Sequence, residues 1–196
     1  MNDDIIFVVY TFLKLDDILN CSFVNKQFYK VTKNETLWKG NIKEIIKFDG
    51  SYCDSFKFNY GLERLKIGIE YDGSIKELYE SKILHLECKR ITKLPYQIEL
   101  LQNLKTLDLS YNQLTTIPDQ LGQLQNLQTL YLSYNKLTTI PDQLWQLQNL
   151  QTLSLYNNQL TTIPDQLGQL QNLQTLSLSY NQLTTIPDQL QKFIKK

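Results

Sequence analysis

The chain has 196 residues, of which 42% are hydrophobic and 20% are charged, a balance that suits one globular domain or two small ones. Its 20 basic and 20 acidic side chains give a formal net charge of zero, which favours neither nucleic acid nor an anionic membrane as a partner. The single histidine and three widely spaced cysteines favour neither a metal site nor a disulfide framework.

The apolar runs are too short for a membrane helix, which needs roughly 20 residues. The first of them follows Asp3 and Asp4 rather than a basic segment, so a secretory signal is not indicated. No nucleophile, base and orienting group occur together in a recognisable pattern. We therefore expect a binding protein rather than an enzyme, without cofactors, in the cytoplasm, with the nucleus left open.

Residues 1–40 predict a small helical domain. Apolar residues from Ile5 to Leu13 recur at helical spacing, and the acidic pair Asp16–Asp17 suits the start of a second helix. A domain of this size has a small interior, and its helices carry more apolar side chains than that interior can bury. We expect a partner, or the rest of the chain, to cover the remainder.

Residues 41–80 predict a linker that also caps the C-terminal half of the chain. Aromatic and aliphatic side chains are frequent here, and the glycines Gly50 and Gly73 mark loops. Such a composition indicates buried contacts rather than a flexible tether. We expect this segment to cover the first strand of the repeats that begin at residue 81.

Residues 81–196 form a repeat with a period of 23 residues. Four units fit the pattern LxxLxLxxNxLxxIPxxLxxL, and they begin at Leu104, Leu127, Leu150 and Leu173. A degenerate unit precedes them, with Lys89 in the asparagine position. The LxL core predicts a short strand, the asparagine a turn out of it, and the proline the start of a short helical or 3₁₀ turn.

One such unit cannot bury its own apolar side, so five units must stack. The pattern resembles the leucine-rich repeat. The resemblance implies an α+β chain in which a small all-α domain precedes a right-handed solenoid with a parallel β-sheet on its concave face. We expect the asparagines Asn112, Asn135, Asn158 and Asn181 to be structural, and Trp145, in a position held by glycine elsewhere, to be partly packed on the convex side.

Residues 1–38 resemble an F-box motif, aligned without a gap. The matching elements are the acidic pair before Ile5, Phe12–Leu13, Leu15 to Leu19, Ser22, Val24, Phe28 and the closing Leu37–Trp38. Met1–Asn2 replaces the usual Leu-Pro opening, and Phe28 replaces a more common tryptophan.

The two resemblances together imply a substrate-recognition subunit of a Skp–cullin–F-box ubiquitin ligase. The helices would bind a Skp-type adaptor, and through it the cullin complex, with these candidate residues: Ile5, Val9, Leu13, Leu15, Ile18, Val24 and Phe28. The alternative is an interaction scaffold without a ubiquitin link, in which the same side chains are only core and the helices only cap the solenoid.

Strand residues between the leucines face the concave side, where a target protein is expected to bind. The candidate target residues are His85, Glu87, Asp108, Tyr131 and Tyr156. Neighbouring strands bring His85 to Asp108, and Tyr131 would approach Tyr156 diagonally. The alternative is that these positions are solvated residues that diverged after duplication. A catalytic or metal-binding role of His85 is not favoured, because the sequence shows no second ligand beside it.

Overall fold

The structure is a computed structural model that describes residue 62 and residues 64–193. The chain divides into two compact units, Met1–Tyr60 and Gly61–Lys196, and the described residues belong to the second. The expected helices of residues 1–40 therefore lie outside the described residues.

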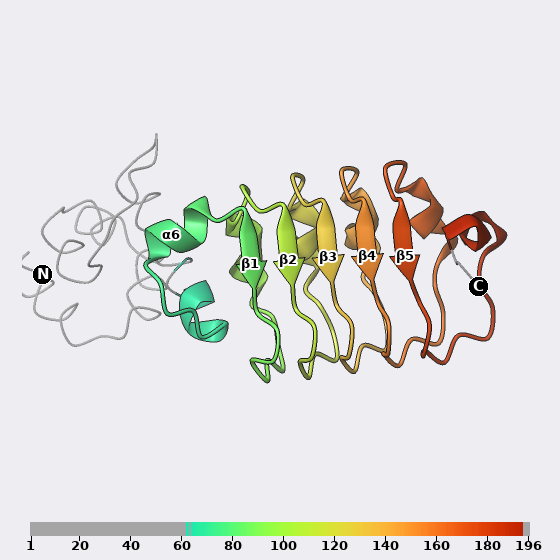
Figure 1. Cartoon of the computed structure of the whole chain (residues 1–196), viewed down its shortest axis with the longest axis horizontal. Coiled ribbons are helices and arrows are strands. Elements are labelled where there is room, and N and C mark those ends of the chain that lie inside the picture. The colour runs from blue at the N-terminus through green and yellow to red at the C-terminus, as the bar shows by residue number, and fades with distance from the viewer. Residues whose placement is uncertain (1–61, 63, 194–196) are drawn as a thin grey trace, which may run out of the picture. The chain divides into compact units, whose positions relative to one another are not determined.

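Five short strands form one parallel sheet in sequence order (Figure 1). They are β1 (Ile83–His85), β2 (Thr106–Asp108), β3 (Thr129–Tyr131), β4 (Thr152–Ser154) and β5 (Thr175–Ser177). Each strand pairs with the next at equivalent positions, so Leu84 lies beside Leu107 and Thr106 beside Thr129. The 23-residue period thus becomes a set of straight columns that run across the sheet.

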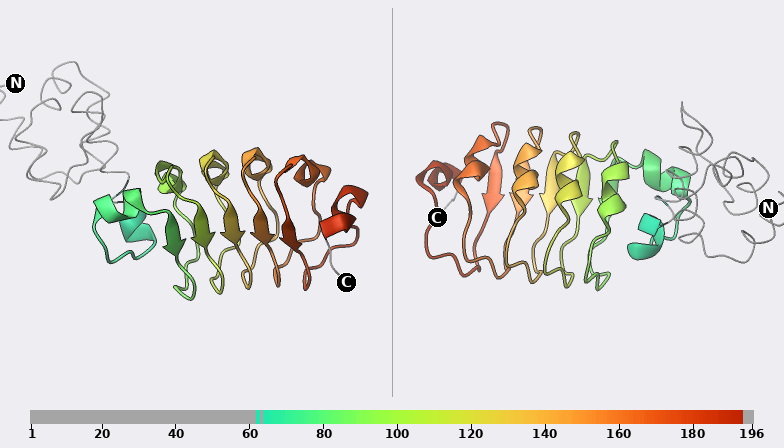
Figure 2. Two further views of the ribbon diagram at one scale, coloured as in Figure 1. Left: turned by 45° about the horizontal axis from the view of Figure 1, so that its top comes forward. Right: turned by 180° about the vertical axis from the view of Figure 1, so that it is seen from behind.

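The other side of the solenoid carries one 3₁₀ helix per unit (Figure 2). These are η1 (Tyr96–Leu100), η2 (Asp119–Gln123), η3 (Asp142–Gln146), η4 (Asp165–Gln169) and η5 (Asp188–Phe193). A proline N-caps each of η1 to η4, with φ between −62° and −73°, the range that its ring fixes. The predicted proline-initiated turns are confirmed as 3₁₀ turns.

The core is a stack of leucines between the strands and the 3₁₀ helices. Leu107 and Leu109 of the LxL motif are completely buried, as are Leu121 and Leu124 from the 3₁₀ side. Burial of one leucine contributes about 1.5–3 kcal/mol, and the same positions are filled again in every unit. The predicted right-handed leucine-rich solenoid with a parallel sheet is confirmed.

Helical residues cover the first unit. Residues 64–68 are helical, and α6 (Ile75–Glu80) follows, with Ile75 and Leu78 buried. A Cβ atom at Gly68 would lie 2.4 Å from Cγ of Pro95, so only glycine allows this helical turn to approach the first repeat so closely.

A capping box begins α6. The Glu77 N–H donates to Oγ of Ser74 at 3.1 Å, and the Ser74 N–H donates to the Glu77 carboxylate at 2.8 Å. The hydrogen bonds from Ser74 lower the pKa of Glu77, because they favour the ionised carboxylate.

An asparagine joins each of the four regular units to the unit before it, and it is buried in the first three of them. Oδ1 of Asn135 accepts from the Leu114 N–H at 3.0 Å, and its Nδ2 donates to the carbonyls of Leu109 at 2.9 Å and Leu132 at 3.1 Å. Asn112, Asn158 and Asn181 make the same set of bonds at their own junctions. The structural role predicted for the asparagine column is the role the structure shows.

The asparagine column gives a stability prediction. We expect Asn135→Ala to lower the free energy of unfolding by about 1–3 kcal/mol, because it leaves the buried Leu114 N–H without a partner and removes one of the two side-chain hydrogen bonds that the Leu109 carbonyl accepts. Urea unfolding followed by circular dichroism measures the change. Asn126 is exposed and makes one bond, to the Gln102 carbonyl, so Asn126→Ala should cost below about 1 kcal/mol. Equal losses in the two variants would contradict the structural role.

Candidate functional site

The candidate target surface is the exposed face of the sheet. The leucines of each LxL motif point into the core, and the residues between them point outward. The register forms an outward column of His85, Asp108, Tyr131, Ser154 and Ser177. Beyond His85 and Asp108 this column consists of one tyrosine and two serines, so it favours hydrogen bonding and aromatic contact over charge.

Three side chains at the N-terminal end of this face lie together. Nδ1 of His85 is 3.7 Å from Oε2 of Glu87, and these two residues and Asp108 offer ligand atoms within 4.8 Å of one another. The Ser110 N–H donates to Oδ1 of Asp108 at 2.9 Å and so fixes this carboxylate. The predicted approach of His85 to Asp108 agrees with the strand register, whereas the interpretation that no second ligand lies beside His85 is wrong, because Glu87 and Asp108 both offer ligand atoms close to it.

An imidazole with two carboxylates is a donor set that suits divalent transition metals. His85 and Glu87 are exposed, however, and exposed acidic groups of this kind are common without an ion. The geometry thus supplies a polar contact point on the face, with both donors and acceptors. It does not by itself assign a metal.

A row of tyrosines runs along one border of the sheet face. We call Tyr111, Tyr134, Tyr156 and Tyr180 the tyrosine row. The rings of Tyr111 and Tyr134 stack with centroids 4.2 Å apart and an interplanar angle of 11°. Tyr156 follows at 5.3 Å from Tyr134, and Tyr180 at 4.9 Å from Tyr156. The row is therefore a continuous aromatic surface across four units.

The backbone of the tyrosine row is unusual. Tyr111, Tyr134 and Tyr180 have φ between 55° and 58°, in the left-handed region that bulky residues rarely adopt. Asn157 holds the same place in the fourth unit at φ 53°, and there the ring comes from Tyr156, one residue earlier. This turn carries the chain out of the strand and aligns the rings, at a cost of order 1–3 kcal/mol per residue.

The aromatic contacts differ from the sequence expectation. Tyr156 packs against Tyr134 and Tyr180 rather than against Tyr131, which lies in the outward column between Asp108 and Ser154. Sequence reasoning missed Tyr111, Tyr134 and Tyr180 as surface residues. The signal was present, because a tyrosine precedes the asparagine in three of the four regular units.

Two members of the tyrosine row, Tyr111 and Tyr156, have a raised pKa. A hydrogen bond with Tyr134, followed by desolvation, raises the pKa of Tyr111 above its ordinary value. Desolvation, followed by hydrogen bonding with Tyr134, raises the pKa of Tyr156 as well. The row thus offers aromatic carbon to a partner, and the raised pKa values of Tyr111 and Tyr156 favour their uncharged hydroxyls.

The convex side has fewer candidate binding features than the sheet face. Trp145 in η3 is 4% exposed, so the expectation of a partly packed side chain is wrong. The neighbouring 3₁₀ helices approach so closely that a Cβ at Gly122 would lie 2.1 Å from the Gln143 carbonyl oxygen.

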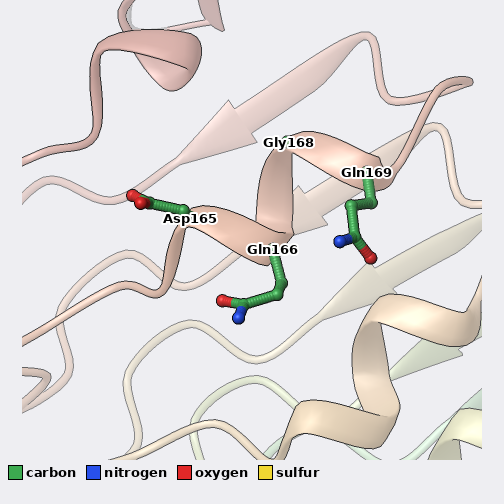
Figure 3. Close-up of a pocket in the computed structure, with 4 residues that line it drawn as sticks. All are labelled: Asp165, Gln166, Gly168 and Gln169. Carbon is green, nitrogen blue, oxygen red and sulfur yellow. The ribbon is translucent and has the colours of Figure 1, made fainter.

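A hollow of about 370 Å³ lies over η4, lined by Asp165, Gln166, Gly168 and Gln169 (Figure 3). The polar ends of its side chains do not converge on one point, as a ligand site would require.

The candidate adaptor residues lie outside the described residues; they are Ile5, Val9, Leu13, Leu15, Ile18, Val24 and Phe28.

Among residues 62 and 64–193, no helix is both long and apolar enough to span a bilayer.

Family comparisons agree with this architecture. A model of the leucine-rich repeat region matches residues 69–195, and a model of the F-box domain matches residues 1–40. The chain belongs to the leucine-rich-repeat family. It is an F-box/leucine-rich-repeat protein, since the F-box domain lies at its N-terminal end. Both domains are typical interaction modules.

Solved structures of other proteins share the solenoid. An internalin, InlF, from Listeria monocytogenes is 26% identical with a TM-score of 0.55, over 67% of this chain and 39% of that one. The BIR3–SERK2 complex from Arabidopsis thaliana is 39% identical with a TM-score of 0.51, over 56% and 62%. The receptor kinase SOBIR1 ectodomain from the same plant is 32% identical with a TM-score of 0.51, over 56% and 63%.

The chain thus spans less than two thirds of each of these three structures. No curated protein matches it significantly.

The contact between Tyr111 and Tyr134 gives a prediction about the pKa of Tyr111. We expect Tyr134→Phe to move the pKa of Tyr111 down toward its ordinary value, because the hydrogen bond that favours the neutral phenol is lost. Carbon-13 NMR of the tyrosine Cζ atoms between pH 8 and about 12 measures it. Tyr131→Phe is the matched control and should leave Tyr111 unchanged. An unchanged Tyr111 pKa in Tyr134→Phe would show that the two hydroxyls do not interact.

Proposed function

We propose that this protein is the substrate-recognition subunit of a Skp–cullin–F-box ubiquitin ligase. The observation that carries the proposal is the F-box match at residues 1–40 directly ahead of the repeat match at residues 69–195. An adaptor-binding module and a protein-binding solenoid on one chain form a connector between two partners. The cytoplasm, where such ligases would meet their targets, is the proposed location.

The proposed role is positional. A target held on the repeats would have its lysines close to a ubiquitin-charged enzyme that the cullin complex brings, which raises their effective concentration. The chain itself would make and break no covalent bond. The repeat pattern supports this role, because leucine-rich repeats typically act as interaction modules.

The chemistry of the sheet face indicates which kind of target surface it can bind. We propose that it binds a protein surface through the outward column and the tyrosine row, which combine neutral hydroxyls with aromatic rings. Tyrosines are frequent anchors of protein interfaces because they bury much area and lose little entropy. The polar group of His85, Glu87 and Asp108 would lie at one end of that contact. A highly charged target fits this face poorly.

Adaptor binding tests the first half of the proposal. We expect the purified full chain to retain a Skp-type adaptor, and Leu13→Asp or Ile18→Asp to reduce retention by at least tenfold, because a carboxylate would enter an apolar contact. Gln159→Asp, on an exposed residue of the repeats, is the control and should bind normally. Co-purification and surface plasmon resonance measure retention. If the unmodified chain did not bind the adaptor, the ligase proposal would be wrong. The alternative, an interaction scaffold without a ubiquitin link, would then be the function.

Target capture tests the second half. We expect Tyr131→Ala with Tyr156→Ala to weaken target capture from the native cytoplasm about tenfold or more, the loss of one interface anchor being worth about 2 kcal/mol. Quantitative mass spectrometry of co-purified proteins measures it. Thr138→Ala with Thr161→Ala changes two exposed residues in the turns before the 3₁₀ helices and should have no effect. Unchanged capture by the tyrosine variant would show that the target binds to another part of the protein.

A further inference from the structure

Three side chains from the first two units meet on the sheet face. His85 is the last residue of β1 and Glu87 follows two residues later, so both point to the same face, with a buried leucine between them. Asp108 is the register partner of His85 on β2, the strand beside β1 (Figure 1). The ligand atoms of the three lie within 4.8 Å of one another. We call these three residues the His–Glu–Asp cluster.

The backbone that carries the cluster is held by hydrogen bonds. The N–H of Leu86 donates to the Asp108 carbonyl at 2.8 Å, and that of Cys88 donates to the Ser110 carbonyl at 3.2 Å, so pairing continues past the end of β1. The Ser110 N–H also donates to Oδ1 of the Asp108 carboxylate at 2.9 Å. A ligand of the cluster would therefore have to order only two exposed side chains on a fixed backbone, which keeps the entropic cost of binding low.

The negative charge of the cluster is not balanced by basic side chains. Within residues 62 and 64–193, no lysine or arginine forms an ion pair with either carboxylate, and the one ion-pair contact of the cluster joins His85 to Glu87. Two carboxylates on neighbouring strands repel each other at this distance. A divalent cation between them would remove the repulsion and accept an electron pair from each carboxylate and from the imidazole.

The rest of the sheet face lacks such groups. The outward positions are 83, 85 and 87 in the first unit and their counterparts in the four regular units. Apart from the cluster, these positions of the described solenoid carry only threonine, serine, tyrosine and isoleucine. All the metal-ligating side chains of the outward positions are thus gathered at one point. Divergence of independent, solvated positions would scatter them along the face instead.

We propose that the His–Glu–Asp cluster binds one divalent transition-metal ion, with Zn²⁺ as the best fit. Zinc takes imidazole nitrogen and carboxylate oxygen at about 2.1 Å, so two ligand atoms of a tetrahedral ion lie about 3.4 Å apart. Nδ1 of His85 and Oε2 of Glu87 are 3.7 Å apart, close to that value. Small rotations of the exposed side chains would close the remaining distances, and water would hold the fourth position.

Magnesium and calcium fit the cluster poorly. Both ions prefer roughly six or more oxygen ligands, whereas the cluster offers two carboxylates and one imidazole nitrogen. Imidazole nitrogen suits zinc and the other late first-row metals. The proposal goes beyond the adaptor and target interactions, and it does not depend on either of them.

The sequence makes the site directly observable. His85 is the single histidine of the chain, so the imidazole nitrogen signals of the ¹⁵N-labelled protein report on this position alone. The full chain is purified without a polyhistidine tag, freed of metal with a chelator and titrated with ZnCl₂. We expect a saturable shift of one imidazole nitrogen at neutral pH, with a dissociation constant below about 100 µM, since a three-ligand site binds metal without refolding.

Two carboxylate variants test whether the cluster acts as a unit. We expect Glu87→Gln and Asp108→Asn each to weaken zinc binding at least tenfold, because each removes a charged ligand. An asparagine at 108 keeps an oxygen for the Ser110 N–H, so the fold should be retained, which circular dichroism checks. Asp119→Asn removes an equal charge from an exposed carboxylate of η2, and Cys88→Ser removes an exposed thiol. Both controls should leave binding within about twofold.

Three results would overturn the proposal. The first is absence of a zinc-dependent shift of the imidazole. The second is unchanged affinity in either carboxylate variant, which would leave adventitious binding to a surface imidazole. The third is displacement of zinc by equimolar MgCl₂, which would indicate a non-selective acidic surface. None of these results bears on retention of a Skp-type adaptor, so failure here is separable from failure of the proposed function.

Discussion

Neighbouring repeats are joined by the side-chain amide of one asparagine, and the rest of the solenoid depends on that junction. The turn after each strand leaves backbone groups inside the molecule where water cannot reach them. A side chain with both an acceptor and two donors satisfies groups of two units at once, as Asn135 does for Leu114, Leu109 and Leu132. The leucines supply most of the free energy of burial, but the asparagine fixes the register in which they stack.

A fixed register has consequences for binding. Equivalent residues fall into columns, so a substitution in one unit changes one defined place on the sheet face. His85, Glu87 and Asp108 meet only because the first two strands keep this register. The tyrosine row likewise depends on the left-handed turn that precedes each asparagine. Much of the chemical variation among the units therefore lies on the sheet face, although Trp145, which replaces a glycine of the sister units, is buried.

The sequence predicted the repeat architecture in detail, because period, strand pattern, asparagine and proline each have one physical role. It predicted less about the side chains on the surface. The stack of Tyr111 on Tyr134 depends on a backbone conformation that periodicity does not reveal, and the burial of Trp145 depends on how closely neighbouring 3₁₀ helices pack. The adaptor residues of the F-box were named from its motif, and they remain predictions.

The junction account is tested most directly by native-state hydrogen exchange of the backbone amides in the chain alone. Leu114 donates to Oδ1 of Asn135 at 3.0 Å, and Leu109, Leu132 and Leu155 donate to the next strand at 2.8 Å. The account predicts slow exchange at all four amides in the unmodified chain, and exchange at Leu114 at least tenfold faster relative to Leu155 in Asn135→Ala, because the acceptor of the Leu114 N–H is removed. An unchanged ratio of the Leu114 and Leu155 exchange rates in Asn135→Ala would contradict it.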